Sequence, residues 1–189
     1  MAQEKHYLDD FCRMIRERSS EHKRAINALH PIASTQMISI LRQELDSMIR
    51  VIYLLAISDI EYREHLMRLT IDGEKWQHPN SRRQVTDRDM VALANSFQHW
   101  TEYVYRFGCA FIHLSEFHDY KTADPVAKLN TEDRNAIYNY MNQYHGMPSR
   151  DFSFQDLLMF LPMVFDKISS NLECYVKSLE EGKKIDLRE

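Results

Sequence analysis

The chain has 189 residues and a formal net charge of −4, with a sequence pI of about 6.1. This acidic balance argues against a broad nonspecific nucleic-acid surface, which is usually basic. Glycine and proline are scarce, with four and five copies. Folds with many turns need more of both residues, so the composition favours long helices. The length fits one domain; we expect it to span residues 1–182, followed by a frayed C-terminal tail at 183–189.

The cysteines and the apolar runs bear on the cellular compartment. Cys12, Cys109 and Cys174 lie far apart and form no paired motif, which is typical of a reducing compartment. The longest unbroken apolar run covers residues 51–57 and is far shorter than a membrane span. The charged start of the chain lacks the apolar core of a signal peptide. These features predict a soluble, cytoplasmic protein with no membrane partner.

Helical signals occur at three places in the first part of the chain. The first covers residues 3–29 and ends at "HPI", because the residue before a proline avoids the α-helical conformation. The second covers residues 33–58 and becomes apolar on nearly every side from residue 48, which predicts a central helix. The sequence "SDIE" has the spacing of a capping box and predicts either a third helix from 59 to about 70 or a bend.

The second part of the chain begins with a polar connection, residues 72–86, which is also the most basic loop. Loops of this length are often functional or mobile. The next helix is predicted from "TDRD" to past residue 113, reaching about 120. Helices over 131–144 and from 153 to about 181 complete a predicted all-α bundle of five to seven helices. Pro162 predicts a kink or a restart in the last of them.

The segment "YRFGCAFIHLSEFHDY" places polar side chains within an apolar helical pattern. Arg106 and His113 are seven residues apart, which on one helix means about 10 Å along the axis and only about 20° in azimuth. Tyr120 falls on the same stripe, whereas His118 points roughly a third of a turn away. Arg106, His113 and Tyr120 are therefore predicted to line one groove.

A structural interpretation of these side chains is open as well. Burying a charge or an imidazole without a partner is costly, and buried ionic groups are usually paired. In that interpretation Arg106 pairs with an acid on a neighbouring helix, with Asp46 and Glu44 as the candidates. His113 is then a hydrogen-bonded histidine of the core.

The motif resembles the HEPN superfamily, in which an arginine precedes a histidine late in an all-helical domain. Here Arg106 and His113 flank "FGCAFI", and "LRQELDSMIRVIYLL" is similar to the long second helix of several members. The resemblance implies a bundle that forms homodimers, with the Arg/His pairs of both copies meeting in one composite site. It also implies a metal-independent ribonuclease with an RNA substrate, in a toxin–antitoxin or defence system with a regulatory protein partner.

The residue chemistry fits RNA cleavage through the 2′-hydroxyl. Histidine titrates near neutral pH and can move the proton, whereas arginine stays charged and matches phosphate geometry. Tyr120, His118 and Asp46 are supporting candidates, and Asp46 would orient the arginine or the histidine. The sequence leaves open whether His113 or His118 is the functional histidine. The i, i+4 ladder of Arg42, Asp46 and Arg50 is interpreted as a structural network.

Other chemistry is not indicated. The sequence has no metal-ligand spacing, no P-loop and no GxSxG motif, so we expect neither a metal nor a cofactor. The alternative to the ribonuclease is a non-enzymatic helical protein-interaction module of HEPN-like fold, which the acidic pI favours. Tyr138, Tyr140 and Tyr144 can stack on bases or cover a bundle surface or subunit interface, and both possibilities are kept.

Overall fold

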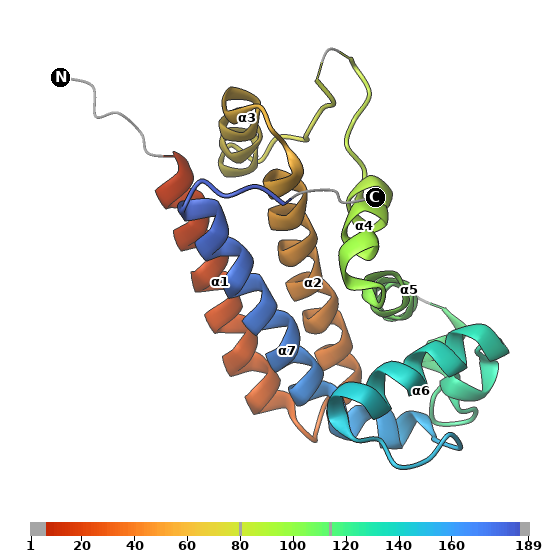
Figure 1. The fold of residues 1–189 in the computed structure, drawn as a ribbon. Coiled ribbons are helices and arrows are strands. Elements are labelled where there is room, and N and C mark those ends of the chain that lie inside the picture. Colours follow the sequence, from red (N-terminus) through yellow and green to blue (C-terminus); the bar gives the residue numbers. More distant parts are fainter. Residues whose placement is uncertain (1–6, 80, 114, 186–189) are drawn as a thin grey trace.

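The computed structural model describes residues 7–79, 81–113 and 115–185, which form a helical bundle without a β-strand (Figure 1). The helices of this part of the chain are α1 (Tyr7–Leu29), α2 (Ser34–Ala56), α3 (Ile60–Ile71), α4 (Asp87–Gln98), α5 (Thr101–Ile112), the 3-10 helices η1 (Glu116–His118) and η2 (Pro125–Lys128), α6 (Thr131–His145) and α7 (Phe154–Glu180). The predicted all-α bundle is confirmed. No helix within the described residues combines the length and apolar composition that crossing a membrane requires.

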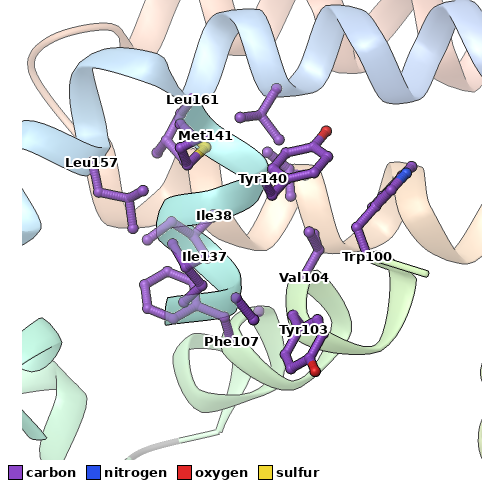
Figure 2. Close-up of a pocket in the computed structure, with 14 residues that line it drawn as sticks. Ile38, Trp100, Tyr103, Val104, Phe107, Ile137, Tyr140, Met141, Leu157 and Leu161 are labelled. Carbon is purple, nitrogen blue, oxygen red and sulfur yellow. The ribbon is translucent and has the colours of Figure 1, made fainter. Parts of the chain in front are cut away.

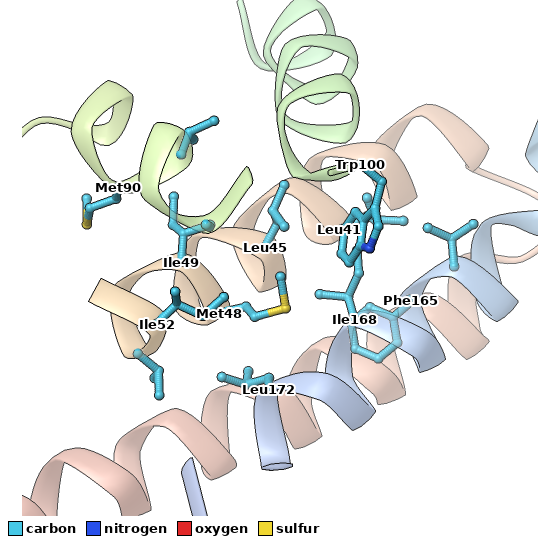
Figure 3. Close-up of a cluster of buried hydrophobic side chains, with 14 of the residues drawn as sticks. Leu41, Leu45, Met48, Ile49, Ile52, Met90, Trp100, Phe165, Ile168 and Leu172 are labelled. Carbon is cyan, nitrogen blue, oxygen red and sulfur yellow. The ribbon is translucent and has the colours of Figure 1, made fainter. Parts of the chain in front are cut away.

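The centre of the bundle is made by α1, α2 and α7, which lie side by side (Figure 1). Helix α2 packs against α1, α4, α5 and α7, and its segment from Met48 to Leu55 is almost entirely buried. Figure 3 shows its side chains meeting Met90 of α4 and Phe165 of α7. Each large apolar side chain buried in this way contributes about 1.5–3 kcal/mol. Because α2 packs against four other helices, the prediction of a central second helix is confirmed.

Helix α7 runs through Pro162 without a restart. Proline removes one backbone hydrogen bond and crowds the preceding turn, but the helix is held by buried side chains on both sides of it. Leu158 and Leu161 precede the proline and Phe165 follows it, all buried in the core. Apolar burial therefore outweighs the local cost of the proline, and of the predicted kink or restart the restart does not occur.

The helix predicted from 86 to past 113 is two helices, α4 and α5, separated by a turn at His99 and Trp100. Trp100 is buried, its ring lies 5.3 Å from that of Tyr140, and its Nε1 donates to Oε1 of Gln98 at 3.1 Å. The side chain of Asn95 accepts the backbone N–H of Glu102 at 3.2 Å, which satisfies one free donor of the new helix. Burial of a large aromatic side chain thus decides where the chain turns.

Arg42 of α2 holds α4 and α5 on the central helices. Its guanidinium, only 3% exposed, lies 2.5 Å from Asp46 and 3.5 Å from Asp87 of α4, and 3.7 Å from the ring centre of Tyr105 of α5. Gly108 of α5 lets the backbone approach the stem of this arginine. Burial is the largest single effect and opposes the charge, yet the contacts with Asp46, Cys109 and Tyr105 together outweigh it and raise the pKa of Arg42 above its ordinary value. The Arg42–Asp46 part of the predicted ladder is formed, whereas Arg50 lies over the ring of Trp76, 5.2 Å from its centre.

A second polar cluster joins α1, α2 and α7. Glu44 is fully buried and lies 2.7 Å from Nδ1 of His22, and Ser19 donates to its other oxygen at 2.5 Å. The hydroxyl of Ser19 is also 2.9 Å from that of Ser169 on α7. Glu44 is therefore engaged inside the bundle, where such hydrogen bonds offset the cost of burying a carboxylate.

The basic loop between α3 and α4 is attached to the bundle. Trp76 is buried and donates from Nε1 to the hydroxyl of Thr70 at 2.8 Å. The phenol of Tyr62 donates to the carbonyl of Gln77 at 2.5 Å, and Gln77 forms an isolated β-bridge with Gln84. These contacts fix the base of the loop on α3.

The chain after α7 returns to the bundle. The backbone N–H of Ile185 donates to the carbonyl of Leu55 at 3.0 Å, and the buried Arg63 donates to the carbonyls of Lys183 and Ile57 at 3.3 and 2.7 Å. The first residues of the predicted frayed tail are thus bound to α2 and α3. Residues 186–189 of that tail lie outside the described part of the chain.

Replacing Gly108 with alanine tests the packing against Arg42. Alanine is the better helix former by about 1 kcal/mol, so propensity alone predicts stabilisation. A Cβ atom at Gly108 would lie 2.9 Å from Cβ of Arg42 and 3.0 Å from its Cδ, and overpacking costs about 1–3 kcal/mol. Because the arginine stem is fixed at both ends, we expect Gly108→Ala to lower the free energy of unfolding in a urea titration. A Gly108→Ala variant with a higher free energy of unfolding than the wild type would refute the close approach of α5 to the Arg42 side chain.

Candidate functional site

The candidate site is a cleft between α5 and α6, above α2 and α7. Its inner part, here called the apolar chamber, encloses about 50 Å³. Figure 2 shows side chains from all four helices converging on it. The chamber is lined among others by Ile38, Val104, Tyr140, Met141, Leu157 and Leu161. Ala136 and Ile137, which also line it, are half-buried, so the chamber reaches the surface between α5 and α6.

A larger outer hollow of about 230 Å³ adjoins the apolar chamber. Tyr103, Phe107 and Ile137 line both spaces. The outer hollow differs in having a polar rim, which is made by Arg106, Lys128, Asn130 and Asp133. The cleft therefore combines a small apolar interior with a charged entrance.

Arg106 lies at this entrance. Its Nη2 is 3.1 Å from Oδ2 of Asp133 on α6, and the side chain is 54% exposed. Asn130 caps α6 by accepting the N–H of Asp133 at 2.8 Å, and its amide donates to Oδ2 of the same aspartate, also at 2.8 Å. The structural interpretation was right that Arg106 pairs with an acid on a neighbouring helix. Neither Asp46 nor Glu44 is that acid.

His113 does not share a helical stripe with Arg106. Helix α5 ends at Ile112, and His113 has an extended backbone with φ −97° and ψ 140° and is exposed. The cause lies in Ser115, whose hydroxyl donates to the carbonyl of Ala110 at 2.7 Å and accepts the N–H of Phe117 at 3.2 Å. These bonds replace the next helical turn, so the predicted register through residue 113 is wrong.

His118 and Tyr120 take part in local packing. His118 belongs to η1, where its Nδ1 accepts the backbone N–H of Ser115 at 3.2 Å and its ring lies 5.9 Å from that of Phe111. The ring of Tyr120 lies 6.0 Å from that of Phe154. Neither side chain lines the chamber or the outer hollow. The stripe that was predicted to include Tyr120 is therefore not formed.

The tyrosines of α6 divide between the interior and the surface. Tyr140 is buried against Trp100, with ring centres 5.3 Å apart, and burial raises its pKa above the ordinary value for a phenol. Tyr144 is exposed and has the amine of Lys167 4.1 Å from its ring centre. Arg150 lies 5.3 Å from the ring of Tyr138. The structure thus makes Tyr140 part of the cleft wall.

The entrance carries both signs of charge. Lys128 lies 3.5 Å from a carboxylate oxygen of Glu116 and donates to that residue's backbone carbonyl at 3.1 Å, and Arg106 faces Asp133. Among the described residues no group of three or more histidine, cysteine, aspartate or glutamate side chains is placed to hold a metal ion. The site can offer hydrogen bonds and charge pairs at its rim and apolar contact inside.

Sequence reasoning found Arg106 but not the residues around it. Lys128, Asn130 and Asp133 were overlooked, although Asn130 and Asp133 have the spacing of a helix N-cap and its third residue. That signal marks the start of α6, but it does not show that α6 meets α5. The pairing with Arg106 became visible only through tertiary structure.

Comparisons of the chain with protein-family models, with curated proteins and with solved structures gave no match. The cleft is therefore interpreted from its own geometry and chemistry. The HEPN resemblance of Arg106 and His113 stays a prediction.

Proposed function

We propose that the protein is a non-enzymatic helical protein-interaction module. In this proposal the cleft between α5 and α6 receives one apolar side chain of a partner protein, and the polar rim binds the polypeptide around it. The observation that carries the proposal is the combination of a side-chain-sized apolar chamber with a rim that bears both charges.

The size of the chamber favours a side chain over a whole ligand. Pockets for drug-sized molecules and cofactors measure roughly 300–1,000 Å³, and a cavity of about 150 Å³ holds benzene. The chamber encloses about 50 Å³, which suits a few heavy atoms. Apolar anchors inserted into pockets of this kind supply much of the binding energy of protein interfaces.

The rim suits a polypeptide because it offers donors and acceptors side by side. On the rim Arg106 and Lys128 donate and the carboxylate of Asp133 accepts, while Glu116, which pairs with Lys128, lies beside the rim. A peptide segment presents N–H and C=O groups in the same alternation. A strongly anionic ligand fits less well, because the two acids offset the two cations.

The positions of the predicted catalytic residues support binding over catalysis. A general acid or base must come within hydrogen-bond reach of the reacting group. His113 lies beyond the end of α5. His118 takes part in local packing, and Asp46 forms an ion pair with Arg42. Of the predicted site residues, Arg106 is the one that lines the cleft.

Binding of N-acetyl-valine methylamide tests the proposal, because this compound presents one small apolar side chain on a peptide unit. Titration should shift the methyl NMR signal of Met141 saturably, whereas N-acetyl-glycine methylamide should not shift it. Ala136→Leu extends a side chain into the chamber and should weaken binding at least tenfold. The matched control is Ala92→Leu on the exposed face of α4, which should bind like the wild type.

Two results would overturn the interaction module. One is the absence of a saturable shift at Met141 in the folded wild type. The other is equal binding by Ala136→Leu and Ala92→Leu, which would place the compound elsewhere on the molecule. Melting curves of both variants establish that each is folded.

A ribonuclease is the second candidate, and the exposure of Arg106 favours it. With 54% of its side chain accessible and Lys128 on the same rim, the guanidinium can contact a phosphate. His113 is exposed immediately after α5. In this proposal two copies of the chain form a homodimer whose Arg106 and His113 residues combine in one composite site.

Cleavage of mixed RNA by purified protein tests this second candidate. His113→Ala should lower the rate about 10²–10⁴-fold through loss of the acid or base, and Arg106→Lys should impair it through loss of the bidentate contact. His65→Ala on the exposed face of α3 is the control and should retain activity. Equal cleavage by wild type and folded His113→Ala would remove that histidine from the mechanism.

A further inference from the structure

The last turn of α6 carries a histidine on the face that closes the apolar chamber. His145 follows Met141 by four residues, so it lies one turn further along the same face of the helix. Met141 is buried and lines the chamber (Figure 2). After His145 the helix ends at Gly146, and Met147 is buried again. The ring of His145 therefore lies where the wall of the chamber ends and the chain turns back into the bundle.

The ring of His145 has a buried nitrogen without a hydrogen-bond partner. Its Nε2 pairs with no group among the described residues. The ring of Tyr140 lies edge-on to the imidazole, with centres 5.6 Å apart, and its hydroxyl is also buried and unpaired. A neutral imidazole leaves Nε2 as an acceptor, whereas a charged imidazole carries a proton on both nitrogens. Protonation would therefore place an N–H donor in a buried position with no carboxylate bound to it, which is costly.

The charged groups around His145 oppose a proton on its ring. Lys167 of α7 repels a positive charge there, and its amine lies 4.1 Å from the ring centre of the adjacent Tyr144. Helix α5 directs its Arg106 to Asp133 at the opposite end of α6. The carbonyl groups at the end of α6 favour a cation. Burial and, to a smaller extent, Lys167 nevertheless hold the pKa of His145 below its ordinary value.

We propose that His145 is a pH-sensitive switch that controls the cleft. In this proposal the neutral ring lets the last turn of α6 lie on α7, and protonation of the ring releases that turn together with the chamber wall that Tyr140 and Met141 form. This regulation rests on the proposed interaction function, because it determines whether a partner's side chain meets a formed chamber.

The direction of the pH effect follows from the two environments of the ring. In the docked turn the pKa of His145 is lowered, whereas a released turn exposes the ring to water and restores the ordinary pKa of 6.5. The released state therefore binds the proton more readily, and acid favours it. The docked turn is fully stabilised above the ordinary pKa. This stabilisation is lost as the pH falls below 6.5 toward the lower pKa of the docked ring.

An NMR titration of the free protein between about pH 8 and pH 5 tests the switch. The ring signals of His145 should titrate with a midpoint below the ordinary value, and the methyl signal of Met141 should shift with the same midpoint. N-acetyl-valine methylamide should bind severalfold more weakly at the acidic end of this range, because only the docked state offers the chamber. Equal affinity at both ends would contradict the control of the cleft by His145.

Two variants assign the pH effect to His145. Lys167→Met removes the neighbouring positive charge, so it should raise the midpoint of His145, and the Met141 signal should follow to the same new midpoint. The matched control is Lys177→Met further along α7, beside Glu173, which should move neither midpoint. In His145→Gln the side chain cannot be protonated, so the Met141 signal should stay constant with pH. If this variant does not fold, the midpoints in Lys167→Met decide the question.

The switch and the interaction module fail on different observations. A Met141 signal that ignores the titration of His145 overturns the switch, and so does a pH-dependent Met141 shift that persists in folded His145→Gln. Failure of N-acetyl-valine methylamide to bind at neutral pH overturns the interaction module. The midpoints of His145 and Met141 in the free protein still decide the switch in that case, because they are measured without the compound.

Discussion

The guanidinium of Arg42 is the contact on which the second layer of the bundle depends. It is buried on α2 and reaches Asp87 at the start of α4 and the ring of Tyr105 on α5. Removing one partner from a buried charge cluster is strongly destabilising, so the three helices are fixed relative to one another. Gly108 extends the same contact, because the absence of a side chain lets α5 lie against the arginine stem.

The cleft follows from this arrangement. Helices α1, α2 and α7 form an apolar core, and Arg42 holds α5 against that core. Helix α6 packs on α5 and α7 and covers the apolar surface between them. Its inner face closes the apolar chamber with Tyr140 and Met141, while its capped first turn brings Asp133 to Arg106. The cleft between α5 and α6 thus has an apolar interior and a polar entrance. Protein interfaces with a buried anchor residue and a hydrated rim show the same pattern.

The sequence predicted the bundle because its main determinants are local. Periodic apolar residues located α1 and α2, a capping-box spacing located α3, and the apolar run of α2 indicated its central place. The break at Trp100 and the end of α5 at Ile112 were missed, because burial of an indole and two hydrogen bonds of Ser115 override a continuing helical pattern. Arg106 was recognised as a polar residue in an unusual setting, yet its partner Asp133 is 27 positions away and no spacing rule connects the two.

Hydrogen exchange in Arg42→Met, compared with the wild type, tests the dependence of the cleft on Arg42 most directly. Methionine keeps most of the volume of the side chain but removes the charge and the contacts with Asp87 and Tyr105. We predict that the amides of α5 and α6 exchange faster in the variant, while those of α1 and α7 keep their protection, because the central core does not contain the arginine contacts with α4 and α5. Unchanged protection of α5 and α6 in the variant would contradict the account.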